Sequence, residues 1–185
     1  MTPAQAARRI GETLDEDSIP YAIGGALALG VWGAPRATND VDLSVFLPRS
    51  ELSRILDSLD RAGVITARDQ AMRDAERIGL FLGLLGRVRI DVFVSEHPQY
   101  AAMAARARRI VDPDGWSGAY ISAEDITLHK LIYNRGKDHA DLERLFAARP
   151  DLDLTYIRAW LAQMVPAGDP RFATLDDLER RFSKR

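Results

Sequence analysis

The part of the sequence that decides the fold lies at residues 21–47 and reads YAIGGALALGVWGAPRATNDVDLSVFL. The apolar residues 21–23 followed by the glycine pair Gly24-Gly25 indicate a short buried strand that ends in a turn. The apolar residues 26–29 then favour the start of a helix. Residues 40–47 alternate between apolar and polar side chains, which predicts a second strand. Its polar face carries Asp40, Asp42 and Ser44.

The segments on either side of this core indicate further helices and strands. Helical spacing of apolar residues predicts helices at 3–17 and at 50–62. Residues 64–66 favour a strand, and residues 77–82 and 87–94 favour a hairpin joined at 83–86. In the hairpin's second strand Asp91 falls on the less apolar face. The cluster at residues 112–115 predicts a turn.

The chain from residue 122 onward has mainly helical patterns. Ser122 is an expected N-cap, Gly136 interrupts the helix that follows, and helical spacing resumes at 138–148, 154–165 and 175–182. Strands followed by helices predict an α+β or small α/β core with a helical carboxyl-terminal part. Of the two we expect the α+β fold, with a mixed sheet flanked by helices. We expect a core at residues 1–121 and a helical part at 122–185 packed on it as one compact unit.

Composition excludes several classes of function. The 185 residues include no cysteine, which rules out disulfides, thiolate nucleophiles and Cys-ligated metals. The net charge of −2 gives no overall attraction to nucleic acid or anionic lipid. The first residues lack a secretory leader pattern, and no apolar stretch is long enough to span a membrane. We therefore expect a cytoplasmic protein without a membrane partner.

The aspartates of the second strand are the main chemical signal. Asp40 and Asp42 lie two positions apart on a predicted strand, so both side chains leave one face with Cα atoms about 6.6 Å apart. Two carboxylates at so short a distance repel each other unless a cation lies between them. Hard oxygen ligands of this kind suit Mg²⁺ or Mn²⁺. Asp91 completes a cluster of three carboxylates if its strand is a neighbour. The alternative is that these aspartates are solvated or form a turn.

The glycine pair suggests a phosphate site. Gly24 and Gly25 lie at a predicted strand-to-helix junction, where backbone N–H groups attract phosphate and the missing side chains allow it to approach. The alternative is that the glycines only permit a tight turn and close helix packing.

Five motifs follow one another along the chain. They are Ile23-Gly24-Gly25-Ala26, Arg36-Ala37-Thr38-Asn39-Asp40-Val41-Asp42-Leu43, Ile90-Asp91-Val92, Ser122-Ala123-Glu124-Asp125-Ile126 with Lys130, and Lys137-Asp138-His139-Ala140-Asp141-Leu142. This ordered set resembles the nucleotidyltransferase superfamily related to DNA polymerase β. Within that superfamily the chain looks most like the minimal AbiEii-type group, which is associated with abortive infection and toxin–antitoxin systems.

The resemblance implies specific roles for the residues of these motifs. Asp40 and Asp42 bind catalytic Mg²⁺ or Mn²⁺, Asp91 is the third carboxylate and helps to activate the attacking hydroxyl, and Gly24 and Gly25 hold nucleotide phosphates. It further implies that the nucleotide-binding residues include Arg36, Thr38, Lys130, Lys137, Asp138 and Asp141. The alternatives are a solvated loop arginine, a threonine that caps its own turn, a solvated helix lysine, and an aspartate at the positive end of a helix dipole.

The implied activity is metal-dependent transfer of a nucleoside monophosphate from an NTP to a hydroxyl group of a tRNA, a protein or a small molecule. A cognate toxin or antitoxin protein is a further implied partner. The chain departs from the family at Ala26, where a serine or threonine hydroxyl is usual. Losing one hydrogen bond to a charged group costs about 1.5–3 kcal/mol. The alternative function is therefore a catalytically weakened, nucleotide-binding regulator or toxin partner of the same fold.

Overall fold

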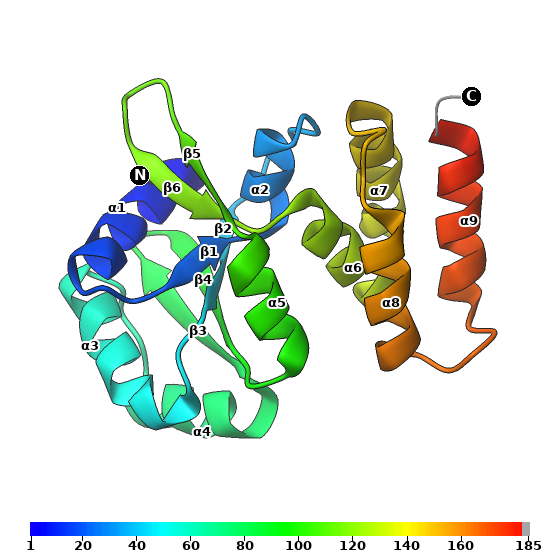
Figure 1. The fold of residues 1–185 in the computed structure, drawn as a ribbon. Coiled ribbons are helices and arrows are strands. Elements are labelled where there is room, and N and C mark those ends of the chain that lie inside the picture. The colour runs from blue at the N-terminus through cyan, green and yellow to red at the C-terminus, as the bar shows by residue number, and fades with distance from the viewer. Residues whose placement is uncertain (183–185) are drawn as a thin grey trace. The chain divides into compact units, whose positions relative to one another are not determined.

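The computed structural model describes residues 1–182 and has the α+β architecture expected from the sequence (Figure 1). A mixed six-stranded sheet has the strand order β3-β4-β2-β1-β6-β5. The strands are β1 (Tyr21–Ile23), β2 (Asp40–Val45), β3 (Leu80–Leu85), β4 (Val88–Val94), β5 (Arg108–Val111) and β6 (Ser117–Tyr120). The helices are α1 (Pro3–Glu16), α2 (Gly25–Val31), α3 (Leu52–Arg61), α4 (Arg68–Ile78), α5 (Pro98–Arg106), α6 (Ala123–Tyr133), α7 (Gly136–Ala148), α8 (Leu154–Met164) and α9 (Pro170–Phe182), with a short 3₁₀ helix at Arg49–Glu51.

The chain forms two compact units. Unit 1 comprises Met1–Leu27 and Ala37–Ile121, and unit 2 comprises Ala28–Arg36 and the chain from Ser122 onward. The end of α2 and the loop after it, residues 28–36, thus belong with the helical unit rather than with the predicted core. Residues 183–185 of the predicted helical part lie outside the described residues.

Unit 1 holds the sheet and has its core on one face of it. Helices α1, α3 and α4 lie along that face (Figure 1). Their buried residues, such as Ile10 in α1 and Ile55 in α3, pack with Val41 of β2 and with Ile90 and Val92 of β4. Apolar residues of β2 and β4 therefore point into this core, and their alternate residues point to the opposite face.

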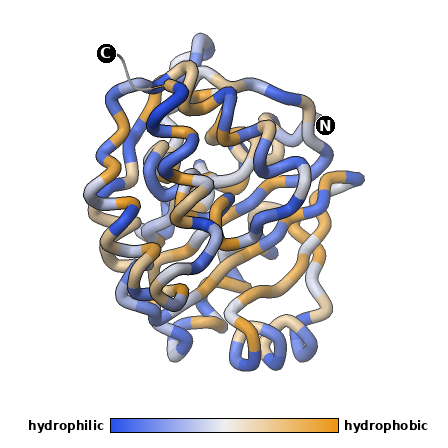
Figure 2. The backbone as a smooth tube through the Cα atoms, turned by 90° about the vertical axis from the view of Figure 1, so that its right-hand side faces the viewer, coloured by the Kyte–Doolittle hydropathy of each residue, from blue (hydrophilic) through white to orange (hydrophobic). Residues whose placement is uncertain are grey.

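Unit 2 is built from helices around a separate core, and α6 is buried on nearly all of its sides. Hydrophobic and hydrophilic residues are interspersed along the backbone on the side of the molecule that Figure 2 faces. The buried residues are Leu128, Leu131, Leu142, Phe146, Ile157, Leu161, Leu175 and Leu178. As expected, the Ser122 hydroxyl accepts a hydrogen bond from the backbone of Asp125 and so caps α6. No helix within residues 1–182 is long and apolar enough to cross a membrane.

Some elements of unit 1 differ from the prediction. Residues 68–78 form α4, and the expected first hairpin strand, 77–82, begins only at Leu80. The hairpin turn is Gly86-Arg87 instead of residues 83–86. The expected strand at 64–66 is a single bridge between Ile65 and Leu84. The predicted turn at 112–115 joins the hairpin of β5 and β6.

Candidate active site

The three predicted carboxylates lie on neighbouring strands. Strands β2 and β4 pair in parallel, with Asp42 directly opposite Asp91 and Asp40 opposite Arg89. Residues opposite each other in register share one face of a sheet, so all three aspartates point away from the apolar core. Their strands are adjacent, as the predicted cluster requires.

Arg89 lies among these carboxylates. Its Nη2 is 3.3 Å from Asp40 Oδ2 and 2.9 Å from Asp91 Oδ2. The Thr38 hydroxyl donates a hydrogen bond to the other oxygen of Asp40. In residues 1–182 no three Asp, Glu or His side chains converge closely enough, as they stand, to hold a metal ion. The expected convergence of three carboxylates is thus not made in this arrangement, because a guanidinium lies between two of them.

The donor set nevertheless fits a hard divalent cation. All three groups offer carboxylate oxygens, which Mg²⁺ and Mn²⁺ prefer. The Arg89 guanidinium shows that a cation is accommodated between Asp40 and Asp91. A divalent ion could take this position if the exposed Arg89 side chain turned toward solvent.

The glycine pair lies directly against Asp42. The Gly24 N–H donates a hydrogen bond of 2.8 Å to the Asp42 carbonyl. Gly25 has a φ of +54°, and a Cβ added to it would lie 1.7 Å from Asp42 Oδ2. A side chain at residue 25 is therefore excluded both by backbone conformation and by the carboxylate. Ala26 follows as a buried residue of α2.

The predicted nucleotide-binding residues of unit 2 form a different cluster. Lys130 Nζ lies 3.2 Å from Asp138 Oδ1 and 2.6 Å from Asp141 Oδ2. Arg36 Nε lies 3.1 Å from Asp141, and Arg135 Nε lies 2.8 Å from Asp138. The Lys130 side chain is 7% exposed, and those of Asp138 and Asp141 are 0% and 2% exposed. These charges therefore already have partners within unit 2.

Electrostatics favour the ionised form of Asp138. Burial by itself raises the pKa of this carboxyl, but hydrogen bonds from Arg135 and the charge of Lys130 outweigh it and hold the pKa below the ordinary value. Asp138 is thus a carboxylate at neutral pH, which keeps the Lys130 ion pair intact. Lys137, by contrast, is exposed on α7.

The structure thus separates the predicted site residues into two groups. Gly24, Gly25, Thr38, Asp40, Asp42 and Asp91 belong to unit 1, and Arg36, Lys130, Lys137, Asp138 and Asp141 belong to unit 2. Sequence reasoning missed Arg89. Its position two residues before Asp91 in an alternating strand is the signal that could have placed it on the carboxylate face.

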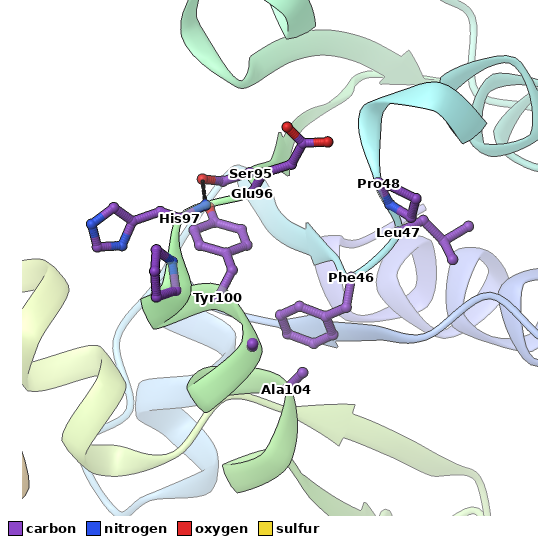
Figure 3. Close-up of a pocket in the computed structure, with 10 residues that line it drawn as sticks. Phe46, Leu47, Pro48, Ser95, Glu96, His97, Tyr100 and Ala104 are labelled. Atoms are coloured by element: carbon purple, nitrogen blue, oxygen red, sulfur yellow. Dashed lines mark hydrogen bonds between the residues drawn. The ribbon is translucent and has the colours of Figure 1, made fainter.

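A pocket of about 450 Å³ lies beyond the carboxyl-terminal ends of β2 and β4 (Figure 3). Asp40 and Arg89 lie at the other ends of these strands. Phe46 and Tyr100 meet there edge to face, with ring centroids 6.3 Å apart. None of the predicted site residues lines this pocket. The carboxylate face and the pocket are therefore distinct features of unit 1.

Solved structures with a similar fold include proteins described as nucleotidyltransferases or as similar to them. The solution structure of the antibiotic-resistance factor ANT(2'')-Ia has 18% sequence identity and a TM-score of 0.57, over 98% of this chain and 100% of that one. A nucleotidyltransferase-like antigenic protein from Paracoccidioides brasiliensis has 19% identity and a TM-score of 0.52, over 95% and 94%. A protein from Thermotoga maritima described as a putative nucleotidyltransferase has 11% identity and a TM-score of 0.53, over 88% of this chain and 96% of that one.

No protein-family model matches the sequence, and no curated protein matches it. The identities to the solved structures are low, so the similarity concerns the fold. The chain has the α+β fold of the nucleotidyltransferases.

Proposed function

We propose that the protein is a metal-dependent nucleotidyltransferase that transfers a nucleoside monophosphate from an NTP to a hydroxyl group and releases pyrophosphate. The observation that carries this proposal is the pairing of Asp42 with Asp91 across β2 and β4, with Asp42 against Gly25. The carboxylate face supplies the cation ligands that phosphoryl transfer needs, and the glycine backbone lies in contact with one of them, Asp42.

Each residue of unit 1 has a role in this proposal. Asp40 and Asp42 would hold Mg²⁺ or Mn²⁺, and Asp91 would orient the acceptor hydroxyl and take its proton. The divalent cation, when bound, neutralises charge that develops on the phosphoryl oxygens. Gly24 and Gly25 would let the triphosphate approach the backbone beside Asp42. Thr38 would fix Asp40 through the hydrogen bond between their side chains.

The residues of unit 2 have a weaker case for nucleotide binding. Lys137 is exposed, so its ammonium group can reach a phosphate without losing a protein partner. Arg36, Lys130, Asp138 and Asp141 would first have to leave their ion pairs. We therefore keep only Lys137 as a proposed phosphate ligand of unit 2, on the ground of its exposure.

A small molecule is the acceptor that we propose. Similar folds include ANT(2'')-Ia in complex with adenylyl-2"-tobramycin and the lincosamide antibiotic adenylyltransferase LnuA bound to lincomycin. The AbiEii-type resemblance would instead point to a tRNA or protein acceptor and to a toxin or antitoxin partner. Since NTPs are the donor, the cytoplasm is the expected compartment.

Label transfer tests this function. The protein is incubated with each NTP labelled on the α-phosphate, with Mg²⁺, and with pools of small alcohols, tRNA and protein. We expect pyrophosphate release and labelled product, both abolished by EDTA and restored by excess Mg²⁺. Calorimetric NTP binding without pyrophosphate release from any pool would contradict the proposal and support the regulator to which Ala26 points.

Replacing Arg89 with glutamine is expected to strengthen Mn²⁺ binding about fivefold. The guanidinium occupies the space between Asp40 and Asp91. Removing this exposed positive charge from beside the carboxylates should make the binding free energy of a divalent cation more favourable by about 1 kcal/mol. Titration of Mn²⁺ followed by electron paramagnetic resonance measures the dissociation constant. Arg87→Gln, in the nearby β3–β4 turn, is the matched control and should bind as wild type does. Weaker or unchanged binding in Arg89→Gln would contradict a metal site between these carboxylates.

A further inference from the structure

Three apolar side chains are exposed beside the carboxylate face. Ile65, Leu82 and Leu84 are 73%, 56% and 50% exposed. We call this set the apolar strip. Leu82 and Leu84 belong to β3, which is the outermost strand of the sheet on that side. Single exposed leucines are common, but exposed apolar side chains that adjoin one another beside polar residues are typical of a binding surface.

The sheet register places the strip in line with the carboxylates. Leu82 is opposite Asp91, which in turn is opposite Asp42. In the next row, Leu84 is opposite Arg89, and Ile65 bridges to Leu84 from the far side. Neighbouring strands lie about 4.8 Å apart. Leu82 is therefore one strand spacing from Asp91, on the same face.

We propose that the apolar strip binds the acceptor substrate, and that this acceptor is a small molecule whose hydroxyl group is flanked by uncharged hydrocarbon. The inference rests on the proposed function, in which Asp91 takes the proton of the acceptor hydroxyl. The acceptor oxygen forms a bond to the α-phosphorus. The bond from that phosphorus to the bridging oxygen breaks, and pyrophosphate leaves with the electron pair. A molecule whose hydroxyl reaches Asp91 from the β3 side must lie over Leu82.

The size and charge of the strip select this class of acceptor. Leu82 and Leu84 lie about 6.8 Å apart along β3, a length that one small molecule can span. The charged residues in the same cross-strand rows are Asp40, Asp42, Asp91 and Arg89. The strip itself is uncharged, so it offers no ion-pair partner to the phosphates of a tRNA or to a polycation.

Binding is tested first, independently of catalysis. Methyl resonances of the full chain are followed by NMR while 2-phenylethanol or ethylene glycol is added. Both probes carry a primary hydroxyl, but only the first has an apolar flank. We expect saturable shifts at Ile65, Leu82 and Leu84 with 2-phenylethanol and none with ethylene glycol. Ile78 and Val111, which are 56% and 66% exposed, are matched controls and should not shift. Equal shifts with both probes, or equal shifts at the control residues, would overturn the proposal.

Variants then connect binding to transfer. The double variant Leu82→Thr with Leu84→Thr keeps residues suited to strands and should weaken 2-phenylethanol binding at least fivefold. Val111→Thr should bind as wild type does. In the label assay the double variant should raise the acceptor KM by the same factor and leave the NTP KM unchanged.

Two further outcomes distinguish a wrong acceptor from a wrong activity. If bulk tRNA or kanamycin accepts label better than 2-phenylethanol, and the double variant does not affect that transfer, the proposed acceptor is wrong while the proposed activity stands. If no acceptor is labelled and no pyrophosphate appears, yet the methyl shifts occur at the strip, the proposed activity fails and the binding surface stands.

Discussion

Replacing Asp42 with asparagine is expected to lower kcat/KM for nucleotidyl transfer by about 1000-fold. The Asp42 carboxylate lies opposite Asp91 and against the backbone of Gly25, so it touches both halves of the proposed site. Asparagine keeps the shape of the side chain but removes the negative charge that would hold a cation. A loss of about 4 kcal/mol of transition-state stabilisation corresponds to this factor.

The measurement is the initial rate of pyrophosphate release at several concentrations of NTP and Mg²⁺. Asp57→Asn is the matched control, because Asp57 is 68% exposed in α3 and forms only a surface ion pair with Arg68. Its rate should equal that of wild type. Thermal unfolding of Asp42→Asn should also match wild type, which separates lost chemistry from lost structure. Equal rates in Asp42→Asn and wild type would remove Asp42 from the mechanism.

Replacing Lys130 with methionine is expected to destabilise unit 2 by about 3–5 kcal/mol. The substitution leaves the carboxylates of Asp138 and Asp141 buried without the ammonium group between them, and breaking a buried ion pair from one side costs about that amount. The expected fall in Tm is about 10 °C. Circular dichroism of the helical signal during heating measures it.

Lys137→Met is the control, because Lys137 lies on α7 of the same unit but is exposed. It should melt as wild type does. Calorimetric NTP titration below the melting temperature completes the test. If Lys130→Met keeps wild-type stability and binds NTP more weakly, Lys130 contacts phosphate and the ion network is not its main role.

The common face of the three carboxylates could be predicted from the sequence because side chains alternate strictly along a strand. A period of two places Asp40, Asp42 and Asp91 on polar faces without any knowledge of the fold. The pairing of β2 with β4 could not be derived in this way, since these strands are separated by two helices and by β3. The contact of Arg89 with Asp40 could not be predicted either, because it depends on the parallel register of β2 and β4.

Helix α4 and the burial of Lys130 could not be predicted from the sequence, because the local pattern of residues gives too weak a signal. Helix α4 carries Ala71 and Ala75 as its buried residues, so its apolar pattern is weak, and its end is marked by the left-handed conformation of Gly79. The burial of Lys130 also has no sequence signal. The sequence predicts a solvated helix position for a lysine five residues after Asp125. In the fold, α7 places Asp138 and Asp141 beside it.

The most direct test of the account is a crystal structure of the protein with Mn²⁺ and a non-hydrolysable NTP, with the anomalous signal of manganese recorded. We expect Mn²⁺ bound to Asp40 and Asp42, phosphates against Gly24 and Gly25, and Arg89 displaced from the carboxylates. Manganese and triphosphate bound elsewhere, with the Arg89 contacts to Asp40 and Asp91 intact, would contradict the proposal that this face of the sheet is the active site.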